Sequence, residues 1–263
     1  MNTPPFTAGP GEHAVTVTRV ADGQWHALDD DLVAGRGHAV RRPDGRLFVS
    51  IDAWHEAAFA ALAAAMLAAL PRPLHAVVDE ADTGLTARWR RAGFTVRRRE
   101  WEYAVPTDPR TTGLGAVLPP PGVTVVPAGR ADEDLLRAVD RAVRDEVEAT
   151  VGWRDMPAEV VPRPAGDTLL DPSKYAAAAT PDGYLGLIRV VTAIRPRIGL
   201  IAVRSGAQRR GIARALLAHT LHALHRSGFD EAWAEVHESN HAASALFRGV
   251  GARPVSSNLE LVR

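Results

Sequence analysis

A proline- and glycine-rich stretch near the middle of the chain constrains the fold more than any other feature. Residues 106–122 contain five prolines and three glycines and have no periodic apolar pattern. Because proline lacks an amide donor and restricts its neighbours, this stretch is predicted to be an extended linker. It divides the 263 residues into an N-terminal domain (residues 1–105) and a C-terminal domain (residues 123–263), both within the ordinary size range of domains.

Composition narrows the possible functions. The chain is 46% apolar and 24% charged, its formal net charge is zero, and it contains no cysteine. The apolar and charged fractions are typical of a globular protein. The absence of cysteine excludes disulfides, thiolate metal sites and cysteine nucleophiles. A general nucleic-acid binder would need a basic excess. The N-terminus has no signal-peptide pattern, and no apolar run could span a bilayer. We therefore expect a cytoplasmic protein with no nucleic-acid and no membrane partner.

The C-terminal domain has a readable order of elements. Hydrophobic period and turn residues predict strands at 123–127, 175–180, 184–191, 197–203, 230–236 and 255–262, and helices at 132–150, 208–227 and 240–250. An antiparallel meander followed by helix, strand, helix and strand is typical of an α/β or α+β domain with a mixed sheet.

The junction between the strand at 197–203 and the following helix is the most informative segment. Its sequence is Gln208-Arg209-Arg210-Gly211-Ile212-Ala213. The first amides of a helix lack internal partners and carry the positive end of the helix dipole, so such a turn can bind a pyrophosphate. Gly211 and Ala213 allow phosphates to approach the backbone, and the two arginines add positive charge. The alternative is an ordinary turn with a pair of surface arginines.

This hexapeptide resembles the Q/R-x-x-G-x-G/A signature of the GNAT superfamily of acyl-CoA-dependent N-acyltransferases. A segment from Asn240 through Phe247 to Gly251 is similar to the second motif of that family. The resemblance covers roughly residues 123–263. It implies a fold in which a mixed, mostly antiparallel sheet is flanked by helices. It also implies acetyl-CoA as cosubstrate and N-acetyl transfer as the activity.

The same resemblance implies which residues contact the cosubstrate. The backbone amides of residues 209–213 would hold the CoA pyrophosphate, residues 201–203 would pair with the pantetheine arm, and Asn240 would hydrogen-bond to that arm. The implied cofactor-binding residues are Ile201, Ala202, Val203, Gln208, Arg209, Arg210, Gly211, Ile212, Ala213, Asn240 and Phe247. At Phe247, family members commonly carry a tyrosine that protonates the leaving thiolate. Phenylalanine cannot donate a proton, and Ser244 or a water could replace it.

An amine acceptor also needs a base, because an amine of pKa near 10 is mostly protonated at neutral pH. Strand alternation puts Glu235 and His237 on one face at the end of the strand that flanks the expected acyl site. Either is a candidate general base. A solvated strand-edge carboxylate is the alternative for Glu235. Trp153 and Asp155, in the segment after the first helix, are candidate acceptor-binding residues.

A second motif overlaps these residues. The segment from His237 to His241 fits the H-E-x-x-H pattern of zinc peptidases, with Glu260 as a possible third ligand. That chemistry requires both histidines on one helical face, and Asn240 is more typical of a helix start. The peptidase pattern also leaves Gln208 to Ala213 without a role. We therefore expect no metal.

The N-terminal domain repeats the order of the C-terminal one. Strands are expected at 25–28, 32–40, 46–51, 74–78 and 95–105, with helices at 53–70 and 82–92. This is typical of an internal duplication and is similar to the tandem-GNAT arrangement of mycothiol synthase. At the position of the CoA loop, however, the segment beginning at Ala53 has no glycine, and Glu56 would repel a pyrophosphate. This domain is therefore predicted to be degenerate and not to bind CoA.

Together these patterns predict one active site, in the C-terminal domain, that transfers an acetyl group by direct attack of a primary amine of a small molecule. The alternative is a CoA-binding or interaction protein without catalysis, which Phe247 and the degenerate first domain would suit. The expected oligomeric state is a monomer or a homodimer.

Overall fold

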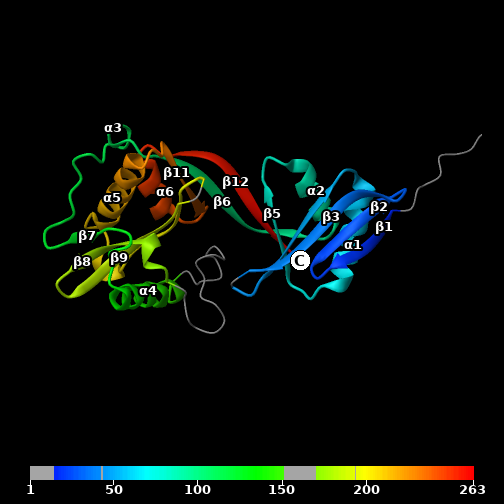
Figure 1. Cartoon of the computed structure of the whole chain (residues 1–263), viewed down its shortest axis with the longest axis horizontal. Coiled ribbons are helices and arrows are strands. Elements are labelled where there is room, and N and C mark those ends of the chain that lie inside the picture. The colour runs from blue at the N-terminus through cyan, green and yellow to red at the C-terminus, as the bar shows by residue number, and fades with distance from the viewer. Residues whose placement is uncertain (1–14, 43, 151–169, 193) are drawn as a thin grey trace, which may run out of the picture.

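The computed structural model describes residues 15–42, 44–150, 170–192 and 194–263. They form two lobes connected by two long strands (Figure 1). The N-terminal part comprises β1 (Thr16–Ala21), β2 (Gln24–Asp29), β3 (Leu32–Arg41), β4 (Leu47–Ala53), α1 (Glu56–Ala69), β5 (Leu74–Asp79), α2 (Thr83–Arg91) and β6 (Thr95–Pro106). The C-terminal part comprises α3 (Pro109–Thr112), β7 (Thr124–Val126), α4 (Glu133–Glu148), η2 (Pro172–Lys174), β8 (Tyr175–Thr180), β9 (Gly183–Val191), β10 (Arg197–Val203), η3 (Ser205–Ala207), α5 (Ile212–Arg226), β11 (Glu231–His237), α6 (His241–Arg248) and β12 (Arg253–Val262).

The described strands form one continuous sheet of 12 strands in the order β1-β2-β3-β4-β5-β12-β6-β11-β10-β9-β8-β7. Most neighbours are antiparallel, whereas β4–β5 and β10–β11 are parallel. A mixed, mostly antiparallel α/β architecture is therefore confirmed. Within the described residues no helix is both long enough and apolar enough to cross a membrane.

The last strand of each part is exchanged with the other part. β6 closes the N-terminal sequence but pairs with β11 of the C-terminal part, from Glu231 opposite Pro106 to His237 opposite Glu100. β12 closes the chain but pairs with β5 of the N-terminal part. The two exchanged strands also pair with each other along the middle of the molecule and run between the lobes in Figure 1. The backbone hydrogen bonds of one part are thus completed by the other.

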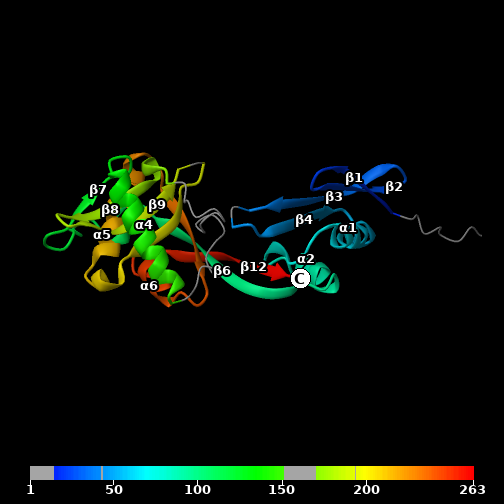
Figure 2. The same ribbon diagram turned by 90° about the horizontal axis from the view of Figure 1, so that it is seen from below.

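Helices pack on both faces of the sheet in the C-terminal lobe, whereas α1 and α2 pack on one side of it in the other lobe. Helices α5 and α6 bury Leu216, Leu221 and Phe247 against Ala234 and Val236 of β11. On the other side of the same lobe, α4 buries an apolar stripe against β8, β9 and β10. In the second lobe α1 and α2 lie on one side of β3 and β4 (Figure 2), around a core that includes Phe59 and Trp89.

Several elements differ from the expectation. The proline-rich stretch 106–122 contains the short helix α3, and Leu114 is buried in the core of the C-terminal lobe. It is therefore partly packed rather than simply extended. The helix expected from residue 208 begins at Ile212, because Gly211 adopts a left-handed conformation before it. The strand β1 lacks a clear alternation of buried residues and is not predicted from the sequence. The division into domains at residues 105 and 123 stays a prediction.

Candidate functional site

The parallel strands β10 and β11 separate shortly after they meet. They pair only at Arg197 with Trp233 and at Ile198 with Ala234. Beyond this point the register of β10 against β9 also shifts, between Ile198 and Leu200. Among the described residues, no strand pairs with that edge of residues 199–203, so peptide groups there can pair with an extended ligand. Ile201, Ala202 and Val203, expected to bind pantetheine, lie along this edge and are partly exposed.

The turn between β10 and α5 presents backbone N–H groups to solvent. Gly211 has φ of 87° and Arg209 has φ of 62°, both left-handed. Among the hydrogen bonds of the described residues, none satisfies the N–H groups of Arg209, Arg210 or Gly211. Ile212 and Ala213 open helix α5, so their N–H groups have no intrahelical acceptor. A succession of such donors at a helix start is a favourable environment for an anion.

Contacts to neighbouring elements fix the position of this turn. The Ser205 N–H donates to Oε2 of Glu146 in α4 at 2.7 Å, and the Arg204 N–H donates to the Leu185 carbonyl in β9 at 2.9 Å. Gln208, expected to contact CoA, donates from Nε2 to the Val203 carbonyl at 3.0 Å. Its side chain therefore joins the end of β10 to the turn.

Asn240 and Phe247 lie on α6, beside the open end of the strands. Asn240 caps the helix, with Oδ1 accepting from the Ala243 N–H at 3.0 Å. Phe247 is 2% exposed, and its ring is stacked on Tyr103 with 6.0 Å between ring centroids. Phe247 thus lines the core beneath the site and not its surface.

The two candidate bases have different surroundings. Glu235 receives a hydrogen bond from Nη2 of Arg197 at 2.5 Å, so the carboxylate is held at the point where β10 and β11 separate. His237 lies at the end of β11, and its Nδ1 accepts from the Ser239 N–H at 3.2 Å. The same Nδ1 lies 2.7 Å from Oγ of Ser239. Glu235 is nearer the closed end of the gap between the strands.

The strand exchange adds residues that sequence reasoning missed. Glu102 of β6 lies directly opposite Glu235, so two carboxylates share one face of the sheet. Like charges in this position are unfavourable, and Ser256 donates a hydrogen bond to Glu102. Local sequence patterns carry no signal for this juxtaposition, because β6 was expected in the N-terminal domain.

The zinc-peptidase arrangement is not formed. His237 lies on strand β11 and His241 on helix α6, with a turn between them. The two rings are therefore not on one helical face. Within the described residues no group of three metal-ligating side chains comes together. Trp153 and Asp155, the expected acceptor-binding residues, lie outside the described residues.

The matching place in the N-terminal part has different chemistry. Strands β4 and β5 also separate after pairing at Leu47 with Leu74 and at Phe48 with His75. Here, however, the first turn of α1 carries Glu56, which forms ion pairs with Arg88 at 3.1 Å and Arg91 at 2.7 Å. A carboxylate at the helix start disfavours a second anion, which supports the prediction that this part does not bind CoA.

Comparisons with known proteins give a family match for part of the chain. Residues 158–252 match the family model described as Acetyltransferase (GNAT) family. Over 51 residues the chain is 45% identical to the [Ribosomal protein bS18]-alanine N-acetyltransferase of Escherichia coli K12, covering 19% of this chain and 34% of that protein. The same match is found to the Shigella flexneri protein. The chain thus spans about a third of the length of these curated relatives.

Solved structures match nearly the whole chain in fold. A GCN5-related N-acetyltransferase from Sphaerobacter thermophilus has a TM-score of 0.63 and 18% identity, covering 94% of this chain and 82% of that one. A tandem GNAT protein from the clavulanic acid biosynthesis pathway has a TM-score of 0.65 and 17% identity, covering 97% and 84%. The GNAT fold is therefore confirmed. The more specific comparison with mycothiol synthase is not.

Proposed function

We infer that this chain, whose residues 158–252 match the family model described as Acetyltransferase (GNAT) family, transfers an acetyl group from acetyl-CoA to the primary amine of a small molecule. The observation that carries the proposal is the combination of an unpaired strand edge with a helix start rich in free N–H groups. The edge at residues 199–203 and the turn before Ile212 are consecutive in the chain. A ligand with an amide-bearing arm and a diphosphate fits both at once.

The turn would hold the pyrophosphate through the N–H groups of residues 209–213, with Arg209 and Arg210 adding positive charge. Each charge-assisted hydrogen bond contributes roughly 1.5–3 kcal/mol. Residues 201–203 would pair with the pantetheine arm, and the Asn240 side chain would hydrogen-bond to it. The Val203 N–H would then face the thioester carbonyl and stabilise negative charge on its oxygen.

Glu235 is the proposed general base. Forming the neutral amine at pH 7 costs roughly 4 kcal/mol when the pKa of the amine is near 10. A carboxylate beside the thioester recovers part of this by removing the proton, directly or through one water. Arg197 orients Glu235 at 2.5 Å, and Glu102 opposite adds negative charge that favours a cationic acceptor. His237 is the second candidate base.

Steady-state assays test this function directly. Purified protein is mixed with acetyl-CoA and a panel of amines that includes amino acids, polyamines, aminoglycosides and a peptide with an N-terminal alanine. Amine-dependent release of CoA thiol, with a matching acetylated product by mass spectrometry, is the expected result. Tight CoA binding without turnover on any amine would instead support the alternative, a CoA-binding protein without catalysis.

A further inference from the structure

Charged side chains line one face of the sheet where the two lobes join. Strand alternation and the register of β11, β6 and β12 put five of them in a continuous series, which we call the polar row: Glu235, Glu102, Glu100, Arg98 and Glu260. The side chains that alternate with them, such as Val236 and Leu259, are buried against α5 and α6 in one lobe and α1 and α2 in the other. The polar row therefore lies on the opposite face, and its first three members are partly exposed there.

The end of the polar row in the C-terminal lobe is acidic. Glu235 and Glu102 are direct cross-strand neighbours, beside the point where β10 and β11 separate. Arg197 donates a hydrogen bond to Glu235, and the Ser256 hydroxyl donates one to Glu102. Two carboxylates directly opposite each other repel, and a further cation beside them relieves that repulsion. This end of the row therefore favours an ammonium group.

The other end of the polar row gathers guanidinium groups by means of a β-bulge. The register of β12 against β6 shifts between Glu260 and Leu261, so that Arg97 is an extra residue in β6. A bulge of this kind re-aims a side chain. Arg97 and its neighbour Arg98 accordingly both reach the Glu260 carboxylate, at 2.9 Å and 3.8 Å. Arg46, just before β4, is a third guanidinium at 3.1 Å from the same carboxylate.

This second end carries an excess of positive charge. Asp44 pairs with Arg46 and Glu100 pairs with Arg98, while Glu260 is shared among three guanidiniums. Two further arginines, Arg41 and Arg42, lie at the end of the β3–β4 hairpin, which extends toward the C-terminal lobe in Figure 2. The Arg98 side chain is 2% exposed, whereas those of Arg46 and Arg97 are 17% and 22% exposed. Arg46 and Arg97 are therefore the members of the cluster that a dissolved anion can reach.

We propose that the amine acceptor is a zwitterion that lies along the polar row. Its amine reacts beside Glu235 and Glu102, and a carboxylate at its other end binds to the guanidiniums of Arg97 and Arg46. The ends of the row are four residues of β6 apart, which is about 13 Å between Glu102 and Arg98. Because an extended peptide advances about 3.3–3.6 Å per residue, three to four residues span this distance. The inference rests on the proposed acetyl transfer and gives the N-terminal lobe the task of selecting the acceptor.

Glycine oligomers test this spacing, because their only charged groups are one amine and one carboxylate. Acetylation by acetyl-CoA is compared for diglycine to pentaglycine and for the C-terminal amide of each, which lacks the negative charge. For the three- and four-residue oligomers, kcat/KM should be at least about 10-fold higher for the acid than for the amide, as expected for charge-assisted hydrogen bonds. Diglycine is too short to reach the arginines and should show a smaller ratio. The difference should appear in KM, because the carboxylate makes the same contacts before and during the reaction.

Arg97→Gln and Arg46→Gln should each lower the acid-to-amide ratio of kcat/KM about 10-fold. Arg91→Gln is the matched control, because Arg91 lies on α2 and pairs with Glu56, away from the polar row, and the ratio should stay at its wild-type value. Thermal unfolding checks that each variant is folded.

Equal kcat/KM for acids and amides in the wild type, or a ratio unchanged in both variants, would overturn the zwitterionic acceptor and leave acetyl transfer intact. Acetylation of other amines but of no glycine oligomer would overturn it as well. Acetylation of no amine at all would instead overturn the proposed function.

Discussion

At the residue scale, the proposed chemistry depends on a few side chains near the end of β11. Glu235 is anchored by Arg197, whereas the Nδ1 of His237 is occupied by the Ser239 N–H. The anchored carboxylate lies beside the last strand pair before the gap. These differences favour Glu235 as the base and give His237 a secondary role.

Glu235→Gln is therefore expected to lower kcat about 100-fold at neutral pH, because the amide cannot accept the amine proton. His237→Gln should change kcat by less than about fivefold, since Glu235 remains in place. The pH dependence of kcat/KM for both variants provides the measurement. A larger loss in His237→Gln than in Glu235→Gln would assign the base to the histidine.

Sequence alone predicts these residues but not all of their partners. The alternation of β11 places Glu235 and His237 on one face, and Asn240 is predicted correctly as a helix start. Glu102 could not be predicted as a neighbour of the site, because its proximity depends on which strand β6 joins. Strand pairing is decided by long-range packing and not by local sequence pattern.

At the scale of elements, the turn before α5 is held by other parts of the lobe. The carboxylate of Glu146 on α4 accepts the Ser205 N–H at 2.7 Å and lies 3.7 Å from the Arg204 guanidinium. Because α4 packs on β9, it links the turn to the sheet. The helix boundary was harder to predict, since the left-handed Gly211 delays the start of α5 to Ile212.

Removing this link should loosen the turn without unfolding the protein. Glu146→Ala is expected to weaken CoA binding about threefold to tenfold, because the amides that we propose bind the phosphates lose one fixed support. Glu133→Ala on the same helix is the control, since Glu133 forms an exposed pair with Arg137 and has no hydrogen bond or ion pair with the turn among the described residues. Dissociation constants from calorimetry provide the comparison. Equal affinities for the two variants would show that the turn needs no support from α4.

At the scale of the whole molecule, the exchange of β6 and β12 ties the two sequence halves together. Residues 115–122 connect them, and Leu118 in that segment is 82% exposed. A protease cut there would leave the pairing of β6 with β11 and of β12 with β5 intact. We expect the nicked protein to migrate as one species in native gel filtration and to separate only in denaturant. Separation of the fragments under native conditions would contradict the exchanged arrangement.

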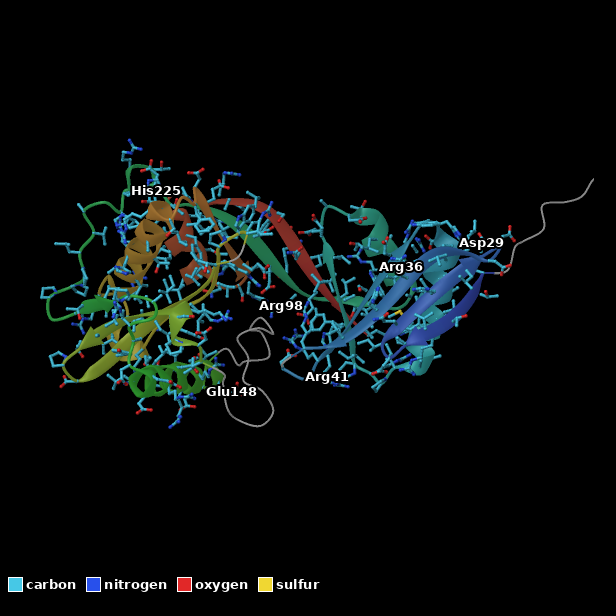
Figure 3. All side chains as sticks on the ribbon, in the orientation of Figure 1. Asp29, Arg36, Arg41, Arg98, Glu148 and His225 are labelled. Carbon is cyan, nitrogen blue, oxygen red and sulfur yellow. The ribbon has the colours of Figure 1, made fainter. Side chains whose placement is uncertain are left out.

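A buried charge cluster lies where β12 crosses into the N-terminal part. Glu260 of β12 lies 2.8 Å from Nδ1 of His75, 3.1 Å from Arg46 and 2.9 Å from Arg97. Arg98, labelled between the lobes in Figure 3, lies 3.8 Å from it. Burial raises the pKa of Glu260, but the hydrogen bond with His75 and the three arginines outweigh it and lower the pKa from 4.5 to about 2.

Because the pKa of Glu260 is lowered in the folded state, the free energy of unfolding depends on pH. A carboxylate with a lower pKa in the folded state stabilises the fold above its unfolded pKa, and the stabilisation is lost as the pH falls toward the folded pKa. The free energy of unfolding should therefore decrease between about pH 5 and pH 2, by about 2–3 kcal/mol from this group. Urea unfolding of wild type and Glu260→Gln across this range is the measurement. The variant should be less stable at pH 7 and lose less on acidification, and parallel curves would contradict the assignment.

The sequence predicted most elements of both halves, because hydrophobic period and capping residues are local signals. It could not predict that the final strands are exchanged, since β6 and β12 have the same alternation whichever neighbour they join. The burial of Leu114 likewise could not be predicted, because it depends on contacts with the C-terminal core and not on the local proline-rich pattern. The duplicated order, by contrast, was visible because it repeats the same local signals.

We propose that the turn around Gly211 binds the diphosphate of CoA. The most direct measurement is calorimetric titration of CoA into wild type, Gly211→Glu and Gly206→Glu. Both glycines have open space for a side chain, but only Gly211 has a positive φ and lies among the free N–H groups. Gly211→Glu should weaken CoA binding at least about 100-fold, because it should lose one or two charge-assisted hydrogen bonds to the diphosphate. Gly206→Glu should weaken CoA binding less than about tenfold, because Gly206 does not lie among those N–H groups. Equal affinity in wild type and Gly211→Glu would contradict the claim.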